Sequence, residues 1–293
     1  LRKDGWFQQQ GIQEPVMANY LDLVSLGSVA DVVPLDSNNR ILVQQGLARL
    51  KAGYARPGIM ALLQVAGRDY QRVNSSDFGF IVGPRLNAAG RLDDMSIGIQ
   101  CLLTQDTALA HELAVELDGL NRDRRAIESS MQNEAMQYLE TVMLDEQALP
   151  AGICLYEESW HQGVVGILAS RIKEKFHRPV IAFAPAEAGN DANDTIKGSA
   201  RSIPNLHIRD VLDGIATQHP EILQKFGGHA MAAGLSLRQQ DFEVFTALFD
   251  AAVKAELSAD DFQEKMITDG ELSAQECHLA TAHVLEQAGP WGQ

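Results

Sequence analysis

The chain has 293 residues, of which 45% are hydrophobic and 22% are charged, so it can form buried cores and is not a disordered segment. Its length suggests about two domains. Asp and Glu number 39 against 24 Lys and Arg, and the formal net charge of −15 excludes a protein that binds polyanions with its whole surface. This charge does not exclude a local basic groove.

The cysteines, Cys101, Cys154 and Cys277, lie far apart and form no C-x-x-C pair, which argues against a zinc ribbon or a disulfide framework and favours a reducing cytosol. Apolar stretches are shorter than the roughly 18 residues of a membrane helix, and no basic-then-apolar leader opens the chain. We therefore expect a cytoplasmic protein without membrane contact. The start at Leu1 and the final turn at 289–293 suggest that the chain is a fragment truncated at both ends.

In the first part of the chain, apolar residues between 16 and 26 recur at spacings of three and four, which predicts a helix. Gly27 and Ser28 interrupt this pattern, and an apolar run at 29–33 contains one acid, Asp31. An acid in such a run must be hydrogen-bonded or bound to a cation. Because no partner lies nearby in the sequence, the residues alone favour a buried, hydrogen-bonded Asp31 over a metal ligand.

Residues 40–91 carry eight Lys and Arg against two Asp, a local charge of +6 that is opposite in sign to the global charge. Within them, residues 83–91 (GPRLNAAGR) predict a rigid turn that carries Arg85, Asn87 and Arg91 among small residues. The turn is either a solvated surface feature or a clamp for backbone phosphates, and the residues leave both interpretations open.

Residues 106–144 predict a long helix, because apolar positions keep a three-to-four spacing while Glu residues fall off that stripe. A turn at 149–152 follows, so we expect the helix to connect two domains. Beyond it, strand-like and helical segments alternate, which indicates an α/β domain. The expected strands are 153–156, 179–184, 197–203 and 232–237, the expected helices are 164–176, 207–215 and 242–257, and a loop is expected at 185–194.

Residues 226–234 (FGGHAMAAG) are the clearest candidate site in this α/β region. Gly227 and Gly228 let the backbone approach a ligand closely, and the turn aims His229. Such a loop can present backbone N–H groups to a phosphate. A tight turn that enters a strand, with His229 as an ordinary polar side chain, explains the same residues equally well.

Two further segments fit an anion. In residues 197–202 (KGSARS), strand alternation puts Ser199 and Arg201 on one face, where a hydroxyl and a guanidinium suit a phosphate. An Arg on a solvated strand face is the commoner meaning of that pattern. In residues 159–167 (SWHQGVVGI), His161 and two glycines lead into a helix N-terminus, which favours anions, and a plain helix start packed on the sheet is the alternative.

Taken together, these segments resemble the RecJ family of single-strand-specific 5′-to-3′ DNA exonucleases, in the DHH phosphoesterase superfamily. Residues 21–35 (LDLVSLGSVADVVPL) look like the fourth motif of the DHH catalytic domain, and residues 227–234 look like the signature of the DHHA1 domain. The resemblance continues through 83–92, 160–171 and 198–202, in the family's order and over essentially the whole chain.

The resemblance implies two α/β domains joined by a long helix. The implied divisions are the C-terminal part of a DHH domain at 1–105, the connecting helix at 106–148, a DHHA1 domain at 149–260, and at 261–293 the start of a linker to an OB-fold domain. The implied function is metal-dependent 5′-3′ exonuclease action on single-stranded DNA in DNA repair and recombination. A single strand with a 5′ end is then the ligand, single-strand-binding protein is a candidate partner, and a monomer is expected.

In this family a two-metal centre, usually manganese with Mg²⁺ as the alternative, activates the water that attacks the phosphodiester. Asp31 is the one residue that maps onto a metal ligand, and the Asp-x-Asp and Asp-His-His motifs are expected upstream of Leu1, so this chain alone should be inactive. His229 is implied as a second catalytic residue. The implied phosphate-binding residues are Arg85, Asn87, Arg91, His161, Ser199, Arg201, Gly227 and Gly228. Ala200 stands where the family usually has Gly, which we expect to narrow the groove.

Two alternatives remain: an oligoribonuclease or cyclic-dinucleotide phosphodiesterase of the same superfamily, and a catalytically inactive nucleic-acid-binding module. The long connecting helix and residues 160–171 resemble the RecJ family more than they resemble the oligoribonucleases or cyclic-dinucleotide phosphodiesterases. The charge distribution supports a local nucleic-acid groove, because residues 106–158 and 239–276 together contribute −17 while residues 40–91 and 195–238 carry +6 and +2.

Overall fold

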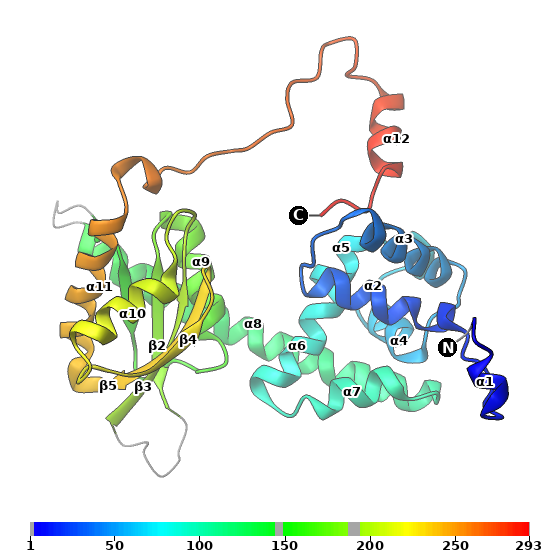
Figure 1. The fold of residues 1–293 in the computed structure, drawn as a ribbon, viewed down its shortest axis with the longest axis horizontal. Coiled ribbons are helices and arrows are strands. Elements are labelled where there is room, and N and C mark those ends of the chain that lie inside the picture. Colours follow the sequence, from blue (N-terminus) through cyan, green and yellow to red (C-terminus); the bar gives the residue numbers. More distant parts are fainter. Residues whose placement is uncertain (1–2, 144–148, 187–193, 293) are drawn as a thin grey trace. The chain divides into compact units, whose positions relative to one another are not determined.

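The computed structural model describes residues 3–143, 149–186 and 194–292 (Figure 1). The chain divides into two compact units, here called unit 1 (Leu1–Arg122 with Gly270–Gln293) and unit 2 (Asp123–Asp269). Helix α8 (Thr107–Met143) begins in unit 1 and ends in unit 2. The long helix expected at 106–144 is therefore confirmed up to Met143, and its last expected residue lies outside the described residues.

Unit 1 is built from helices around one apolar core. The fully buried side chains of Leu50, Ile59 and Leu62 belong to this core. Besides the start of α8, its helices are α1 (Trp6–Gln9), α2 (Leu21–Ala30), α3 (Ser37–Lys51), α4 (Pro57–Val65), α5 (Ser75–Asp77), α6 (Gly83–Leu92), α7 (Ser96–Leu103) and α12 (Leu279–Gln287), with 3₁₀ turns at Met17–Tyr20 and Tyr70–Arg72 and a π-helix at Phe78–Val82.

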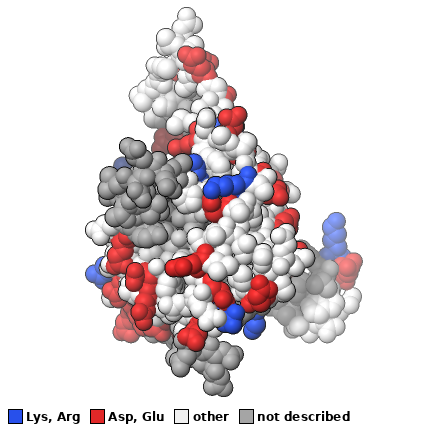
Figure 2. Space-filling view, turned by 90° about the vertical axis from the view of Figure 1, so that its left-hand side faces the viewer, with Lys and Arg blue, Asp and Glu red and all other residues white. Residues whose placement is uncertain are grey.

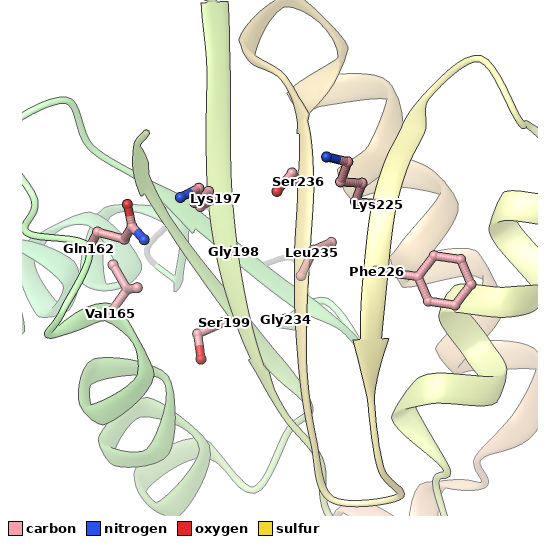
Figure 3. A pocket seen from close by; sticks show the side chains of 10 residues that line it. All are labelled: Gln162, Val165, Lys197, Gly198, Ser199, Lys225, Phe226, Gly234, Leu235 and Ser236. Atoms are coloured by element: carbon pink, nitrogen blue, oxygen red, sulfur yellow. The ribbon is translucent and has the colours of Figure 1, made fainter. Parts of the chain in front are cut away.

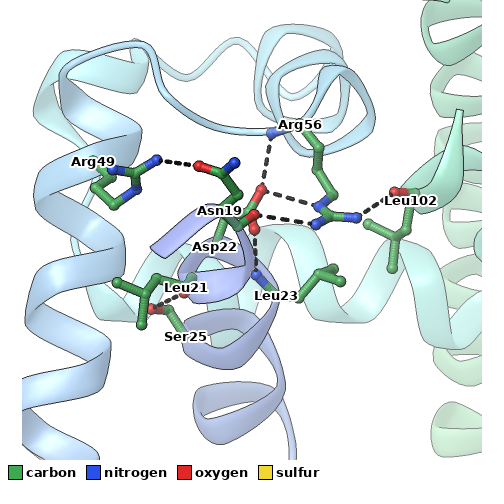
Figure 4. A network of polar contacts seen from close by, with 8 residues as sticks. All are labelled: Asn19, Leu21, Asp22, Leu23, Ser25, Arg49, Arg56 and Leu102. Carbon is green, nitrogen blue, oxygen red and sulfur yellow. Dashed lines mark hydrogen bonds and ion pairs between the residues drawn. The ribbon is translucent and has the colours of Figure 1, made fainter. Parts of the chain in front are cut away.

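A buried ion pair joins three parts of unit 1 (Figure 4). The carboxylate of Asp22, on α2, accepts hydrogen bonds from the backbone N–H of Arg56 at 2.9 Å and from its Nε at 3.0 Å. The same guanidinium donates to the carbonyl oxygen of Leu102, on α7, at 3.1 Å. Asp22 is only 3% exposed, so each charge depends on the other for its stability in the interior.

The sequence around residue 83 was expected to form a rigid turn, and this expectation is wrong. Gly83 begins α6, and Pro84 lies in the first turn of that helix. Proline is tolerated there because the first N–H groups of a helix have no partner within it, and its fixed φ suits a helix. The Gly-Pro pair therefore starts a helix instead of breaking the chain.

The mixed α/β class is confirmed for the chain as a whole, and the strands of its described part all lie in unit 2. The sheet has five strands in the order β1-β2-β3-β5-β4 (Figure 1). Its strands are β1 (Ile153–Tyr156), β2 (Val180–Pro185), β3 (Thr195–Arg201), β4 (Leu223–Gly228) and β5 (Ala232–Arg238). Strand β4 was not expected, because its glycines indicated a loop. Of the loop expected at 185–194, residues 187–193 lie outside the described residues.

Helices cover the two faces of this sheet unequally. Helices α10 (Ile208–Gln218) and α11 (Phe242–Glu256) pack with the sheet into the main core of unit 2, and α9 (Val165–Phe176) packs on the other face against β2 and β3. Consequently β2 is buried on both faces, whereas β3 and β5 alternate between buried and accessible residues. One face of β3, β5 and β4 is therefore open beside α9.

The end of the chain packs on unit 1. Residues 270–293 are assigned to that unit, and the guanidinium of Arg40 donates to the carbonyl oxygen of Pro290 and lies over the ring of Trp291, 5.9 Å from its centroid. Among the described residues, no helix is both long enough and apolar enough to cross a membrane.

Replacing Asp22 with Ala should lower the free energy of unfolding by about 3 kcal/mol, because Arg56 would be left buried without its counter-charge. Urea denaturation followed by far-UV circular dichroism measures this loss. Asp31→Ala is the matched control, since Asp31 is exposed, and it should change the unfolding free energy by less than about 0.5 kcal/mol. Equal effects of the two substitutions would contradict the structural role of the ion pair.

Thiol accessibility provides a second check of the fold. Cys101 and Cys154 are buried and Cys277 is exposed; burial raises the pKa of Cys101 to about 11 and raises that of Cys154 further. A disulfide reagent at neutral pH should therefore label Cys277 rapidly in the native protein and the other two only after unfolding. Cys277→Ser should abolish the rapid phase. Rapid labelling of all the thiols would contradict this packing.

Candidate nucleic-acid interface

Ser199 and Arg201 lie on the same face of β3, as strand alternation predicts, next to the first turn of α9. The Nη1 atom of Arg201 donates hydrogen bonds to Ser199 Oγ at 3.1 Å and to the carbonyl oxygen of Ala200 at 2.8 Å. Both side chains fit against Gly166 of α9, where an added Cβ would lie 2.9 Å from each of them. A hydroxyl and a guanidinium are thus fixed in one place, which is the donor set that a phosphate requires.

The start of α9 adds to the positive character of this place. No side chain caps the helix, whose N-cap residue is Val164. His161 lies in the preceding loop, where its Nδ1 accepts a hydrogen bond from the N–H of Gly163 at 3.0 Å. The N–H groups of Val165 and Ile167 donate to the carbonyl oxygens of His161 and Val164, so the feature of this end that favours an anion is the helix dipole. His161 therefore shapes the loop through Nδ1, and its Nε2 has no hydrogen-bond partner among the described residues.

Two paired glycines form the part of the open face next to Ser199. Gly234 of β5 is paired with Ser199 on one side and with Gly227 of β4 on the other. A Cβ added to Gly227 or to Gly234 would meet nothing within 4 Å, so the fold does not require glycine at either position. What the missing side chains provide is room for another molecule to approach the backbone.

Gly228 has a different role from Gly227. Its φ is +150°, and an added Cβ would lie 2.4 Å from the carbonyl oxygen of Ala232. This glycine is required by the backbone at the end of β4. Gly228 therefore has a structural role, and its expected phosphate-binding role stays a prediction, as does that of Gly227, beside which there is room for a ligand.

His229 is exposed in the turn between β4 and β5. Its N–H donates to the carbonyl oxygen of Ala232 at 2.9 Å, and the N–H of Ser202, next to Arg201 in the chain, donates to the carbonyl oxygen of Met231 at 3.0 Å. The turn that carries His229 is thus held at the Arg201 end of β3. Its catalytic role remains a prediction.

A groove of about 380 Å³ runs across this open face (Figure 3). Besides Ser199 and Gly234, its lining includes Lys197, Lys225 and Ser236, which the sequence did not single out. Lys197 could have been found, because it precedes Ser199 by two residues and so faces the same side of β3. Lys225 could not, because β4 itself was not expected.

Ala200 does not narrow the groove, contrary to the expectation. Its side chain is fully buried and belongs to the core on the opposite face of the sheet. Successive residues of a strand point to opposite faces, so a methyl group between Ser199 and Arg201 cannot reach their side.

In unit 1, Asp31 is exposed, contrary to the expectation of a buried acid. Helix α2 continues through Gly27 and Ser28 and ends at Ala30, so the apolar run does not form a buried strand. Among the described residues the carboxylate of Asp31 has no hydrogen-bond or ion-pair partner. It is therefore accessible to a ligand from outside the chain.

The residue after Asp31 holds an unusual backbone conformation. Val32 has a φ of +54°, in the left-handed region that β-branched residues avoid. Its N–H donates to the carbonyl oxygen of Val29 at 3.2 Å, and that of Val33 donates to the carbonyl oxygen of Ser28 at 3.0 Å. This is the Schellman arrangement that ends many helices, with Val where Gly is usual. The turn stores strain directly beside Asp31.

The described residues of this chain do not by themselves fit a metal ion. No group of three or more His, Cys, Asp or Glu side chains among them is arranged to hold one. Asp31 supplies a single carboxylate, and a divalent cation such as Mn²⁺ or Mg²⁺ needs several ligands. A metal held by Asp31 would require ligands from outside the described residues.

The three α6 residues differ in accessibility. Arg85 is 8% exposed and forms an ion pair with Asp118 of α8 at 2.8 Å. It also donates to the carbonyl oxygen of Ile81 at 2.8 Å. These contacts give Arg85 a structural role, and the phosphate contact expected of it stays a prediction. Asn87 and Arg91 are exposed and, four residues apart on the helix, share one face of α6.

The structure therefore groups the candidates within each unit. In unit 2, it brings Ser199, Arg201, Gly227 and the loop of His161 to one side of the sheet. Acidic residues predominate elsewhere in that unit, as Figure 2 shows from the side where α11 lies in Figure 1, and residues 239–269 hold eight acids against two bases.

Residues 148–255 match the family model of the DHHA1 domain. The sheet with its glycine-lined groove therefore lies in a DHHA1 domain, and the protein is one of the class that contains this domain.

Whole-chain comparisons narrow the class. The chain is 55% identical over 293 residues to the single-stranded-DNA-specific exonuclease RecJ of Dickeya dadantii, covering 100% of this chain and 50% of that protein. It is 54% identical to RecJ of Escherichia coli with the same coverage. The chain belongs to the RecJ family, and it spans about half the length of the curated relatives it matches.

Solved structures agree with this assignment. RecJ of Thermus thermophilus in complex with Mg²⁺ superposes with a TM-score of 0.77 at 30% identity, covering 98% of this chain and 42% of that one. An exonuclease RecJ bound to manganese gives a TM-score of 0.65 at 31% identity, over 87% of this chain and 61% of that one. Solved relatives therefore hold Mg²⁺ or Mn²⁺.

Replacing Val32 with Gly should raise the free energy of unfolding by roughly 0.5–1 kcal/mol, because relief of the left-handed strain exceeds the entropy that Gly gains in the unfolded chain. Val32 is 59% exposed, so little packing is lost. Urea denaturation measures the change. Val33→Gly, where φ is not positive, is the control and should destabilise. Destabilisation by Val32→Gly as well would show that the valine side chain outweighs the strain.

Proposed function

We propose that this chain is the nucleic-acid-binding part of a metal-dependent exonuclease that degrades single-stranded DNA from the 5′ end in DNA repair and recombination. We propose that this exonuclease acts in the cytoplasm as a monomer, and that single-strand-binding protein is a candidate partner. The identity to RecJ proteins over the whole chain supports this proposal. The proposal also includes the domain limits expected from the sequence, with the DHH part ending at residue 105, the connecting helix at residue 148 and the DHHA1 domain at residue 260.

The observation that carries the proposal is the contrast among the glycines of the open face. Gly227 and Gly234 occupy strand positions where a side chain would fit and would favour the strand. Beside them stand Ser199 and Arg201, a donor pair for phosphate. A flexible polyanion that lies close to the backbone explains both features, because the glycines admit it and the donors hold its phosphates.

Such a groove binds a strand through its backbone. Contacts of Arg and Ser with phosphate oxygens fix the position of the strand without reading its sequence. A narrow groove admits one strand more easily than a duplex, so specificity for single strands follows from shape. In the proposal, His161 and His229 of unit 2 act with this donor set, and Asn87 and Arg91 are phosphate-binding residues of unit 1.

Hydrolysis requires residues beyond those described. We propose that Asp31 contributes one ligand to a two-metal centre whose other ligands come from the Asp-x-Asp and Asp-His-His motifs of the longer protein. The carboxylate of Asp31, exposed and without a partner, is available for this role. Since it is a single ligand, the chain alone should bind single strands and hydrolyse them little.

The test is to measure both properties of the 293-residue chain. With 5′-phosphorylated oligothymidylate and Mn²⁺, salt-sensitive binding with negligible release of nucleotides is expected. Robust cleavage would contradict the assignment of the metal ligands. Absence of binding at low salt would contradict the proposed groove. A catalytically inactive binding module is the second candidate, favoured by the absence of a metal-ligand cluster among the described residues.

The double substitution Gly227→Ala with Gly234→Ala should separate binding from folding. The added methyl groups meet no protein atom, so the free energy of unfolding should rise by about 0.5–1 kcal/mol per site. The methyl group at position 234 lies in the lining of the groove and the one at position 227 lies on the same face beside it, so single-strand binding should weaken several-fold. Fluorescence anisotropy and urea denaturation measure the two effects.

Gly214→Ala provides the control, because an added Cβ there also meets nothing within 4 Å and the residue lies on α10, outside the groove. It should raise stability without changing binding. Unchanged binding by the double variant would show that the glycines are not a ligand surface.

A further inference from the structure

Three polar residues cross the groove in one row, next to the row that contains Ser199. Ser236 of β5 is paired with Lys197 of β3 on one side and with Lys225 of β4 on the other. The next row, two residues along β3, is Ser199, Gly234 and Gly227. Figure 3 shows the two lysines on either side of Ser236.

The lysines are close enough to act on one ligand. Neighbouring strands are about 4.8 Å apart, so the two lysine backbones are separated by roughly 10 Å, with Ser236 between them. Lysine side chains are long and can converge over the serine. Rows two residues apart along a strand are separated by roughly 6.7 Å, comparable with the spacing between neighbouring phosphates of an extended strand.

A β-bulge turns Lys225 toward the groove. Leu223 is paired with Leu237, and both are buried, but the next pair is Lys225 with Ser236, so β4 has one extra residue at this point. In a regular strand, Lys225 would point to the same face as Leu223, which is the core. The extra residue reverses the alternation and places the lysine outside.

Within the part of the chain that the structure describes, the two lysines have no counter-charge. Both are exposed, and among the described residues neither has an ion pair or a side-chain hydrogen bond. The nearest basic groups on this face, those of Arg201 and Arg238, add to the positive field instead of neutralising it, although Arg238 is paired with Asp241 at 2.7 Å. Two like charges around one hydroxyl are unfavourable unless an anion lies between them.

We propose that Lys197, Ser236 and Lys225 form a second phosphate-binding row, which holds the phosphate next to the one bound by Ser199 and Arg201. This inference rests on the proposed function, since it extends the same groove along a single strand. The ligand is the phosphodiester backbone and not the bases, because the lysine and serine side chains of the groove are donors for phosphate oxygens. Phe226 is the one aromatic residue in the lining, and its ring turns away from the lysines (Figure 3) and packs against the core instead of offering a surface for a base.

The experiment compares the wild-type chain with the double variant Lys197→Gln and Lys225→Gln. Binding to oligothymidylate is measured by anisotropy as a function of salt. Loss of two phosphate contacts should reduce the slope of log affinity against log salt by about 1.4 and weaken binding at low salt by roughly tenfold. Because both lysines are exposed, the unfolding midpoint should not change.

A matched control removes two positive charges elsewhere on unit 2. Lys175→Gln with Lys265→Gln changes the net charge equally, and these residues lie outside the groove. The control should leave the salt slope within about 0.3 of the wild-type value. An equal effect of both double variants would show a response to net charge and would overturn the second row.

Oligonucleotides with one neutral methylphosphonate linkage locate the contacts. The wild-type chain should lose affinity when either of two adjacent linkages is neutral. The lysine variant should lose its response at one of them, and Arg201→Gln should lose its response at the other. A wild-type chain that binds no single strand contradicts the proposed function itself. Binding that depends on Arg201 but is unchanged by the lysine variant contradicts only the second row.

Discussion

The antiparallel register of β3, β5 and β4 is the constraint on which the candidate site depends. It aligns Ile196, Leu235 and Leu237 toward the core, and the same alternation leaves Lys197, Gly234 and their neighbours on the open face. A slip of one residue would expose the apolar side chains and bury a lysine, each at a large cost in free energy. The apolar residues that stabilise the sheet therefore also determine which polar residues meet a ligand.

Sequence patterns predicted the helices and strands whose apolar residues follow a simple pattern. The long helix α8 and the strands β1, β2, β3 and β5 were expected within two residues of their observed limits, because each has either a regular apolar period or, in β1 and β2, a continuous apolar run. Strand β4 was missed, since its glycines and its bulge disrupt that period. The bulge depends on the partner strand β5, which no local pattern in β4 describes.

The candidate site was predicted by residue type, but the sequence could not separate ligand-binding residues from structural ones. Arg85 and Arg201 both follow a glycine in a conspicuous motif, yet Arg85 is paired with Asp118, 33 residues away. Gly227 and Gly228 are adjacent, yet only Gly228 is required by the backbone around Ala232. Asp118 is distant from Arg85 in the chain, and Ala232 approaches Gly228 only because the chain turns between β4 and β5, so both distinctions appear only in three dimensions.

The bulge in β4 has a consequence for how related proteins should be compared. The extra residue lets Leu223 face the core and Lys225 face the groove although the two are two residues apart in the chain. A strand of the same length without the bulge would turn Lys225 inward and Phe226 outward. Deletion of residue 224 would instead leave a regular strand in which Leu223 still pairs with Leu237 and Lys225 with Ser236, so both faces would be kept. The pairing of each residue with β5 is therefore a better marker of a shared groove than the number of residues between Leu223 and Gly227.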